Sequence, residues 1–470
     1  MNGSRIVVAE FNELTPHLVD AFVRAGELPN FARMFRESEI WTTCSDEPAP
    51  NLEPWIQWVT LHCGVPFSKH GIFRLGDGAN NAFPSLWDLV SEAGGEAWVC
   101  GSMNAARGPA FKGWFLPDPW THAQGAAPGE LDALYRFISS RVVEHTNPNV
   151  KHSRADALRF LSFMARHGLT ASTVMSVVRQ LLGEVRDRST RWRRAMILDR
   201  LMLDVFLWRY RRSRSALSTY FSNSTAHFQH IYWRYFDPEP FSVKPTAEES
   251  RRYGDAVLSG YRNMDWMLGR MLDSIDDKTT VVLATALSQQ PCLKYEDQGG
   301  KRSYRPRDFA RFFDALGVEG VKRIEPVMTH QFHCEFSDER AAQAGMEKLL
   351  SLEYPGAGAV LTVFREGAKL FGGCRVSIAV PAGTTVDSAL LQRSWRFDEL
   401  FYLVDTVKSG MHDLDGMLWI RRPDRRHAVH PGTVPLVDVA PTLLEILGLP
   451  APPAMEGRSL SSREREALSA

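Results

Sequence analysis

The sequence lacks a charge excess, a cysteine framework and a long apolar run. Lysine plus arginine and aspartate plus glutamate number 55 each in 470 residues, so no net field favours a nucleic-acid partner. The six cysteines are scattered without a Cys-x-x-Cys pair, which indicates reduced thiols. No apolar segment is long enough to span a bilayer, and the first residues lack the basic and apolar regions of a secretory signal. These absences favour a cytoplasmic protein.

Short apolar strands alternate with amphipathic helices in much of the chain. We expect strands at Ile6–Ala9, Ala97–Cys100 and Thr280–Ala284, and a helix around Ser85 to Ala93. This alternation predicts an α/β fold with a mainly parallel sheet sandwiched by helices. Changes of character divide the chain into a core in three parts (1–130, 218–305 and 397–470), a basic helical insertion (131–217) and a small α+β insertion (306–396).

The helical insertion is rich in arginine. Ten arginines between positions 186 and 214 are interleaved with aromatic residues such as Trp192, Trp208 and Tyr210. One interpretation is a solvated face whose arginines lay their apolar stems along the helices. The other is a lid or docking surface for a phosphate, an anionic glycolipid or a membrane headgroup. Spacing alone does not separate the two.

The small insertion has strand and helix patterns of its own. Val327–Phe336 alternates like a strand, and residues 338–350 read as a helix with Ser337 as N-cap. Further strands are expected at Ala359–Phe364 and Arg375–Val380. The set suits a compact α+β unit.

Several short runs at both ends of the chain form a set. The C-terminal part holds Gly410 to Ile420, Val437 to Leu444 and Met455 to Leu460, and the N-terminal part holds Gly26 to Phe31 and Cys63 to Ile72. Together they resemble the alkaline phosphatase superfamily, nearest its nucleotide pyrophosphatase/phosphodiesterase branch. The resemblance implies an alkaline-phosphatase-like sheet and a site where two metal ions surround a Thr or Ser nucleophile.

Most of the implied site is replaced in this chain. The family's aspartate after the first strand falls at Asn12, or less favourably at Glu10, and its nucleophile falls at or beside Pro54, where Glu53 is the nearest reactive side chain. The Asp-x-x-x-His pair falls on Ala226 to His230 and keeps only the histidine, and the Asp-His pair after the strand at 280–284 is gone. His230 and His412 belong to one metal in the family, so we expect one divalent cation of the zinc or manganese type, or none.

Three groups of residues are candidates for the site. The first is Asn12 and Glu13 at the end of the first strand, where open α/β sheets bind ligands, although a glutamate there also suits a helix dipole. The second surrounds Pro54, which we expect to open a helix. There Glu53 is a candidate general base, nucleophile or metal ligand, and Trp55, Gln57 and Trp58 are candidate substrate contacts or simply core.

The third group lies at 223–234. His227 and His230 are candidate metal ligands together with His412, Trp233 is a candidate substrate contact, and a lone buried histidine would instead be a core residue. Gln289 and Gln290 follow the strand that lost its Asp-His pair, and are candidates to bind a neutral part of the substrate.

These observations predict a divergent alkaline-phosphatase-fold enzyme. It would act by hydrolysis or group transfer on an anionic ester or glycosyl phosphate, with a small-molecule or glycan substrate of phosphate, sulfate or nucleotide-sugar type. Catalysis would fall to Glu53, His230, His412 and Asn12, which we expect to meet with Gln289 at one edge of the sheet. The alternative, favoured by the lost nucleophile, is an inactive member that binds a glycan or nucleotide or serves as a scaffold. The oligomeric state is left open.

Overall fold

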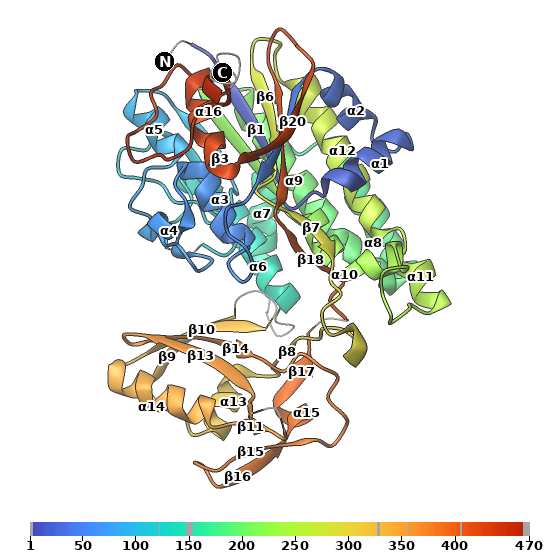
Figure 1. Cartoon of the computed structure of the whole chain (residues 1–470), viewed down its shortest axis with the longest axis vertical. Coiled ribbons are helices and arrows are strands. Elements are labelled where there is room, and N and C mark those ends of the chain that lie inside the picture. The colour runs from blue at the N-terminus through green and yellow to red at the C-terminus, as the bar shows by residue number, and fades with distance from the viewer. Residues whose placement is uncertain are drawn as a thin grey trace.

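The computed structural model describes residues 3–121, 123–146, 154–326, 330–356, 358–404 and 407–463, and Figure 1 shows them as a larger and a smaller lobe. The larger lobe contains an eight-stranded sheet. Its order is β20 (Ala428–Pro435), β2 (Glu39–Cys44), β19 (Asp415–Arg421), β6 (Thr280–Ala284), β1 (Ile6–Phe11), β5 (Leu217–Ser222), β3 (Ala97–Cys100) and β4 (Gly113–Leu116). Among these strands only β19 runs antiparallel to its neighbours, so the predicted mainly parallel sheet is confirmed.

Strand β1 shows why the sheet is covered on both faces. All six of its residues are buried, as expected of a central parallel strand. Val7, Ala9 and Phe11 pack into one core, and Ile6 and Val8 into another. The helices on the first face include α1 (Pro16–Arg24), α2 (Pro29–Arg36), α9 (Arg194–Tyr210) and α12 (Ala256–Ser274), and those on the second include α3 (Pro54–Cys63), α5 (Leu86–Glu92) and α16 (Val439–Ile446).

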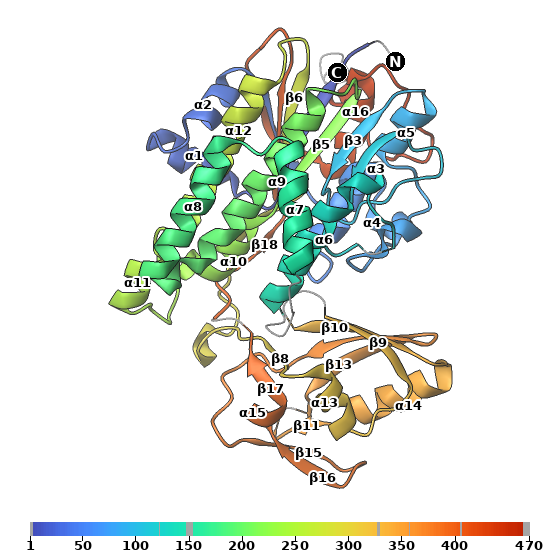
Figure 2. The ribbon, with the colours of Figure 1, turned by 180° about the vertical axis from the view of Figure 1, so that it is seen from behind.

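Long helices occupy the stretch where the sequence predicts them. They are α6 (Asp132–Thr146), α7 (Arg154–Arg166), α8 (Ala171–Arg186) and α9, and Figure 2 shows α7 and α8 on the outside of this side of the molecule. The remaining helices of the larger lobe are α4 (Phe67–His70), α10 (Ser224–Phe236) and α11 (Ala247–Tyr253), with short 3-10 turns η1 (Asp77–Asn80), η2 (Gly129–Leu131), η3 (Arg188–Arg193) and η5 (Leu436–Asp438). No described helix combines the length and the apolar character needed to cross a bilayer.

Two paired strands connect the lobes. The chain leaves β6 through β7 (Ser288–Pro291) and returns through β18 (Gly410–Asp413), and these strands pair antiparallel with His412 opposite Gln289 (Figure 1). Backbone hydrogen bonds from Cys292 to Ser409 and from Lys408 to Lys301 continue the pairing outward. The small lobe is therefore held by two adjacent connections that start at the carboxyl end of the central sheet.

The small lobe has its own hydrophobic core. It contains two sheets of four strands each. The order of the first is β13 (Leu361–Glu366), β14 (Lys369–Cys374), β10 (Gln331–Phe336) and β9 (Val321–Pro326). The order of the second is β12 (Gly358–Ala359), β11 (Glu353–Tyr354), β15 (Thr385–Ser388) and β16 (Arg393–Arg396). The pair β8 (Tyr304–Pro306) and β17 (Phe401–Leu403), the helices α13 (Phe309–Ala315), α14 (Glu339–Leu350) and α15 (Phe397–Leu400), and the 3-10 turn η4 (Glu296–Gln298) complete this part of the chain.

Two predictions for this lobe are wrong in detail. Residues 375–380 form no strand, because the neighbours β13 and β10 start at Leu361 and Gln331, and their pairing with β14 ends at Cys374 and Gly373. The N-cap of α14 is Asp338, whose carboxylate accepts a hydrogen bond from Ala341 N at 2.8 Å, and not Ser337. Residues 327–329 of the predicted strand lie outside the described residues.

Candidate functional site

Glu13 is the centre of the site. It follows β1 directly with a left-handed backbone (φ 58°), and its side chain is buried. Asn12 Nδ2 donates to Oε1 at 2.7 Å, and Gln289 Nε2 donates to Oε2. Burial by itself would raise the pKa of Glu13, but the positive charge that His230 and His412 carry when protonated and the hydrogen bonds from His230 and Gln289 lower it to about 2. Glu13 is therefore a carboxylate at neutral pH.

Two histidines face the same carboxylate oxygen. His230 Nε2 lies 3.0 Å and His412 Nε2 lies 3.5 Å from Glu13 Oε2. On the other side of each ring, Nδ1 lies against a backbone carbonyl. His230 Nδ1 is 3.0 Å from Gly410 O, and His412 Nδ1 is 2.7 Å from Leu52 O. Because a carbonyl oxygen only accepts, Nδ1 carries the proton in both rings and Nε2 is the atom left to bind a cation. Glu13, His230 and His412 form the cluster in the described residues with metal-ligand geometry.

Glu53 stands beside this cluster. It is the N-cap residue of α3, its Oε2 lies 3.5 Å from His412 Nδ1, and its side chain is 32% exposed. Burial raises the pKa of Glu53 to about 7, and the charge of Glu13 adds to this, whereas Lys408 and Lys301 oppose it. A carboxyl group that titrates near neutrality is suited to accept and return a proton.

Buried amides and hydroxyls hold Glu13 in place. Gln229 Nε2 donates to the backbone oxygen of Glu13 at 2.7 Å, and Tyr261 donates its hydroxyl to Gln229 Oε1 at 2.6 Å. Asn12 donates to Asn223 Oδ1 at 2.8 Å and accepts from Trp58 Nε1 at 2.7 Å. These bonds fix the left-handed turn that aims the carboxylate at the two imidazoles.

Close packing at β18 requires a glycine. A Cβ on Gly410 would lie 2.2 Å from Gln289 Oε1 and 2.6 Å from Gln229 O, closer than a Cβ approaches other heavy atoms in proteins. The Gly410 carbonyl is also the partner of His230 Nδ1. The absence of a side chain at 410 therefore lets Gln289, Gln229 and His230 approach one strand.

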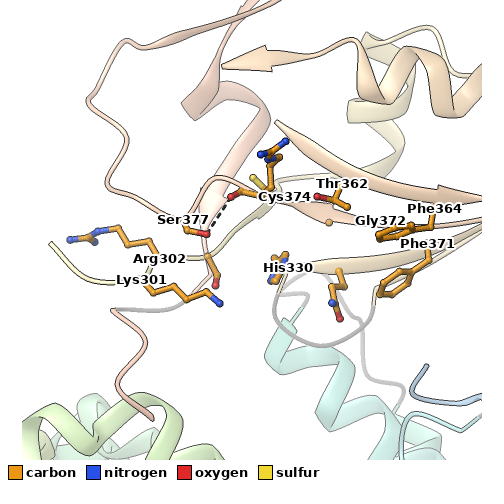
Figure 3. Close-up of a pocket in the computed structure, with 13 residues that line it drawn as sticks. Lys301, Arg302, His330, Thr362, Phe364, Phe371, Gly372, Cys374 and Ser377 are labelled. Atoms are coloured by element: carbon orange, nitrogen blue, oxygen red, sulfur yellow. Dashed lines mark hydrogen bonds between the residues drawn. The ribbon is translucent and has the colours of Figure 1, made fainter. Parts of the chain in front are cut away.

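A cationic cleft adjoins the site on the small lobe. Lys301 and Lys408 lie on the two connections between the lobes, and both positive charges act on Glu53. Lys301 also lines a pocket of about 320 Å³ with His330 and Arg302, and Figure 3 shows its side chain reaching towards His330 while Arg302 points away. Burial, together with Lys301, Lys408 and Arg305, lowers the pKa of His330 to about 4. This cleft favours an anion.

The structure brings most predicted site residues together. Asn12, Glu13, Glu53, His230, Gln289 and His412 meet within hydrogen-bond or ion-pair distance of one another, and Gln290 Nε2 donates to the backbone oxygen of His412 at 3.3 Å. Glu13, predicted to contact substrate, lies with His230 and His412 in a group that could hold a metal ion.

Other predicted residues lie elsewhere. His227 is half-buried one helical turn before His230 and is not part of the group of Glu13, His230 and His412, so the structure does not bring it to the other two predicted ligands. Trp233 is 1% exposed and packs in the hydrophobic core, so it is not available to a substrate. Trp58 and Gln57 are fully buried, and Trp58 serves by holding Asn12. Trp55 donates Nε1 to Phe73 O at 3.0 Å and lies partly exposed.

Sequence reasoning missed Lys301, Lys408 and His330. They lie on or after segments that cross between the lobes, and the approach of Lys301 and Lys408 to Glu53 depends on the pairing of these two residues, which are 107 positions apart. The hydrogen-bonded pair Gln229 and Tyr261 was missed for the same reason. Their only sequence signal was polarity within otherwise buried helices.

Comparison with known proteins gives similar solved structures. No protein-family model matches the chain, and no curated protein matches it. Human ectonucleotide pyrophosphatase/phosphodiesterase 5 is 10% identical, with 98% of this chain and 99% of that chain covered and a TM-score of 0.44. Phosphonoacetate hydrolase from Sinorhizobium meliloti is 11% identical, with 95% and 96% covered and a TM-score of 0.42. Wild-type alkaline phosphatase PafA is 11% identical, with 97% and 98% covered and a TM-score of 0.46.

These neighbours are members of the alkaline phosphatase superfamily, the family that the sequence resembles. With identities near 10% and TM-scores below 0.5, the similarities carry no argument about the activity of this chain. The function proposed below rests on its own residues.

Proposed function

We propose that this chain is a hydrolase that cleaves an anionic ester by direct attack of water, with one divalent cation held by Glu13, His230 and His412. One observation carries the proposal. Both imidazoles donate Nδ1–H to backbone carbonyls and turn Nε2 to the same carboxylate oxygen, the arrangement by which proteins orient histidines for a metal.

The donor set fits a cation. Burial lowers the pKa of His412 to about 3, so at neutral pH its Nε2 carries a lone pair, and this lone pair faces the ionised Glu13 at 3.5 Å. Two acceptors at this distance repel each other, and a cation between them would satisfy both. Two histidines and one glutamate are a common set for zinc, with manganese as an alternative, and such a cation would polarise an oxygen of the anionic group.

Glu53 supplies the base. With a pKa of about 7, it is partly ionised under physiological conditions and partly exposed to entering water. It accepts a proton as the water oxygen bonds to phosphorus, and returns that proton to the leaving oxygen as the ester bond breaks. No covalent intermediate is needed, which agrees with Pro54, a residue without a hydroxyl, at the start of α3.

Lys301 and Lys408 support an anionic substrate. Their charges face Glu53 from the connections between the lobes, and neither lysine has a carboxylate ion-pair partner among the described residues. A phosphate-type group that lies between Glu13 and these lysines would be neutralised on the side opposite the cation site. Phosphate esters and glycosyl phosphates are the favoured class, and sulfate or nucleotide-sugar substrates share the required charge.

A second candidate function is binding without catalysis. Pro54 favours it, because this position cannot supply a nucleophile. In that case the Glu13 cluster and the lysines would hold an anionic glycan or nucleotide and Glu53 would have no catalytic task. The two candidates differ in what Glu53 does.

The test is hydrolysis by protein reloaded with zinc or manganese after chelation. A panel of sugar 1-phosphates, sugar sulfates and nucleotide sugars would be offered in water enriched in oxygen-18. We expect cation-dependent release with one labelled oxygen in the acidic product of a single turnover, and no labelled enzyme. Tight binding of a panel member without turnover would support the binding function, and neither binding nor turnover would contradict both.

The location is also a proposal. We place the protein in the cytoplasm, on the scattered positions of its six cysteines, all of which are free thiols. Labelling of this protein on intact cells by a membrane-impermeant thiol reagent would contradict the cytoplasmic location.

A further inference from the structure

Helix α8 packs with its polar side inward. Thr173 and Glu184 are its buried residues. Glu184 accepts from Arg194 Nε at 2.8 Å, and Gln180 Nε2 donates to the Thr190 carbonyl at 2.9 Å. Arg200 of α9 donates to Ser176 Oγ at 2.7 Å. Hydrogen bonds and an ion pair therefore join the buried side of α8 to the rest of the protein.

The opposite side of α8 is apolar and exposed. Val174, Met175, Val178, Leu181, Leu182 and Val185 are between 42% and 86% exposed, and their spacing places them on one stripe of the helix. With Leu158 and Leu161 of α7, two helices carry eight of the 15 large hydrophobic residues that are exposed in the described chain. A single exposed leucine is ordinary, but a gathered stripe marks a contact surface. We refer to the six residues as the α8 stripe.

Arginines border the α8 stripe. Residues 154–214 contain 14 arginines, no lysine and five acidic residues, in a chain whose total charges balance. Arg179, Arg186, Arg188 and Arg191 are exposed at or just after α8. An apolar helix face with arginine at its edge is typical of helices that lie in the plane of a membrane surface.

The α8 stripe could be covered by a second copy of the chain or by a membrane surface, and the charge of its border favours the membrane. A second copy that packed the α8 stripe against itself would bring two arginine-rich borders together, and like charges at an interface disfavour association. An anionic bilayer covers the apolar stripe with acyl chains and pairs the arginines with headgroups.

We propose that the α8 stripe docks on the surface of an anionic phospholipid bilayer, with the apolar residues in the headgroup boundary and the bordering arginines on lipid phosphates. The proposal is independent of the hydrolase function, because none of these residues belongs to the Glu13 cluster. It places the protein at a membrane surface, which no helix among the described residues is long and apolar enough to cross.

The experiment is sedimentation of the full chain with vesicles. We expect binding to vesicles of phosphatidylglycerol and phosphatidylcholine, weak binding to pure phosphatidylcholine, and release by salt. The double variant Leu181→Glu, Leu182→Glu should lose at least about tenfold in vesicle affinity. Arg186→Gln and Arg188→Gln should each lose roughly fivefold on anionic vesicles. Leu390→Glu, a change at another exposed leucine in the small lobe (60% exposed), is the matched control and should bind like the wild type.

Hydrogen exchange on the unaltered protein gives a second measurement that does not depend on a variant's folding. Anionic vesicles should slow exchange over residues 171–186 and not over the small lobe. Absence of vesicle binding would overturn the proposal. So would a dimer in solution that Leu181→Glu, Leu182→Glu dissociates, since that result would assign the stripe to a second copy of the chain.

Discussion

The Glu13 cluster and helix α8 both reverse the usual arrangement of polar and apolar groups, and they do so in opposite directions. Around Glu13, ionisable side chains lie inside the protein at the carboxyl edge of the sheet. On α8, apolar side chains lie outside. In the first region amides and backbone carbonyls hold the carboxylate and the two imidazoles, and both Nε2 atoms are turned to one carboxylate oxygen. In the second region nothing within the described chain covers the stripe. Each reversal therefore indicates a missing contact, which is a cation beside Glu13 and a surface against α8.

The largest expected effect is on catalysis. Glu53→Gln keeps the shape of the side chain but cannot accept a proton, so kcat should fall by about 10²–10⁴-fold while cation binding is retained. In the wild type, kcat/KM should rise with pH up to about 7 as Glu53 ionises, and the variant should lose this limb. Glu399→Gln, at an exposed glutamate of α15, is the control. An unchanged rate in Glu53→Gln would remove Glu53 from the mechanism.

The second-largest expected effect is the loss of cation affinity when a histidine ligand is replaced. His230→Ala or His412→Ala removes one of three ligands, and we expect a loss of at least roughly 100-fold in zinc affinity, since even the hydrogen-bond partners of ligands contribute 10–100-fold. Titration calorimetry on the chelated protein measures this. The control is His427→Ala, whose imidazole faces the Ser38 carbonyl away from the site. Equal zinc affinity in all three variants would show that His230 and His412 are not ligands of the cation.

Substitutions at two adjacent residues of α8 test which side of this helix faces the protein. Glu184→Leu removes a buried carboxylate that accepts from Arg194 and Gln180, and the loss of these hydrogen bonds should lower the free energy of unfolding by about 1–3 kcal/mol. Val185→Gln changes a residue that is 86% exposed and should alter it by less than about 0.5 kcal/mol. Chemical denaturation compares them. The opposite order would show that α8 buries its apolar side in solution.

The smallest expected effect is on the thermal stability of the chain, through the ionisation of Glu53. The pKa of Glu53 in the folded chain, about 7, lies above its ordinary value of 4.5. As pH rises from about 4.5 to 7 the unfolded chain loses this proton first, so the contribution of Glu53 to stability falls and stays low above pH 7. Glu53→Gln should therefore leave Tm unchanged at pH 4 and raise it by about 1–3 °C at pH 8. A lower Tm at pH 8 would assign Glu53 a structural role.

The sequence predicts the framework of the fold but not its inter-lobe contacts. Buried apolar strands such as Thr280–Ala284 and the proline-led helix at Pro54 are recognisable because their patterns are local. His230, His412 and Glu53 were found because they stand at positions that the family resemblance marks. The roles of Glu13 and Lys408 depend on a left-handed turn and on the return path of the chain from the small lobe, neither of which has a local pattern. The inverted packing of α8 was also hidden, since an amphipathic sequence does not say which side faces the protein.

The metal content of the purified chain, measured after equilibration with zinc and gel filtration, shows whether Glu13, His230 and His412 hold a cation. We expect one tightly held ion per chain, reduced to none in the double variant His230→Ala, His412→Ala. The cluster contains only one set of three ligands in the described residues, so a second tight ion is not expected. No bound zinc in the wild-type protein, or one ion that the double variant retains, would contradict the account.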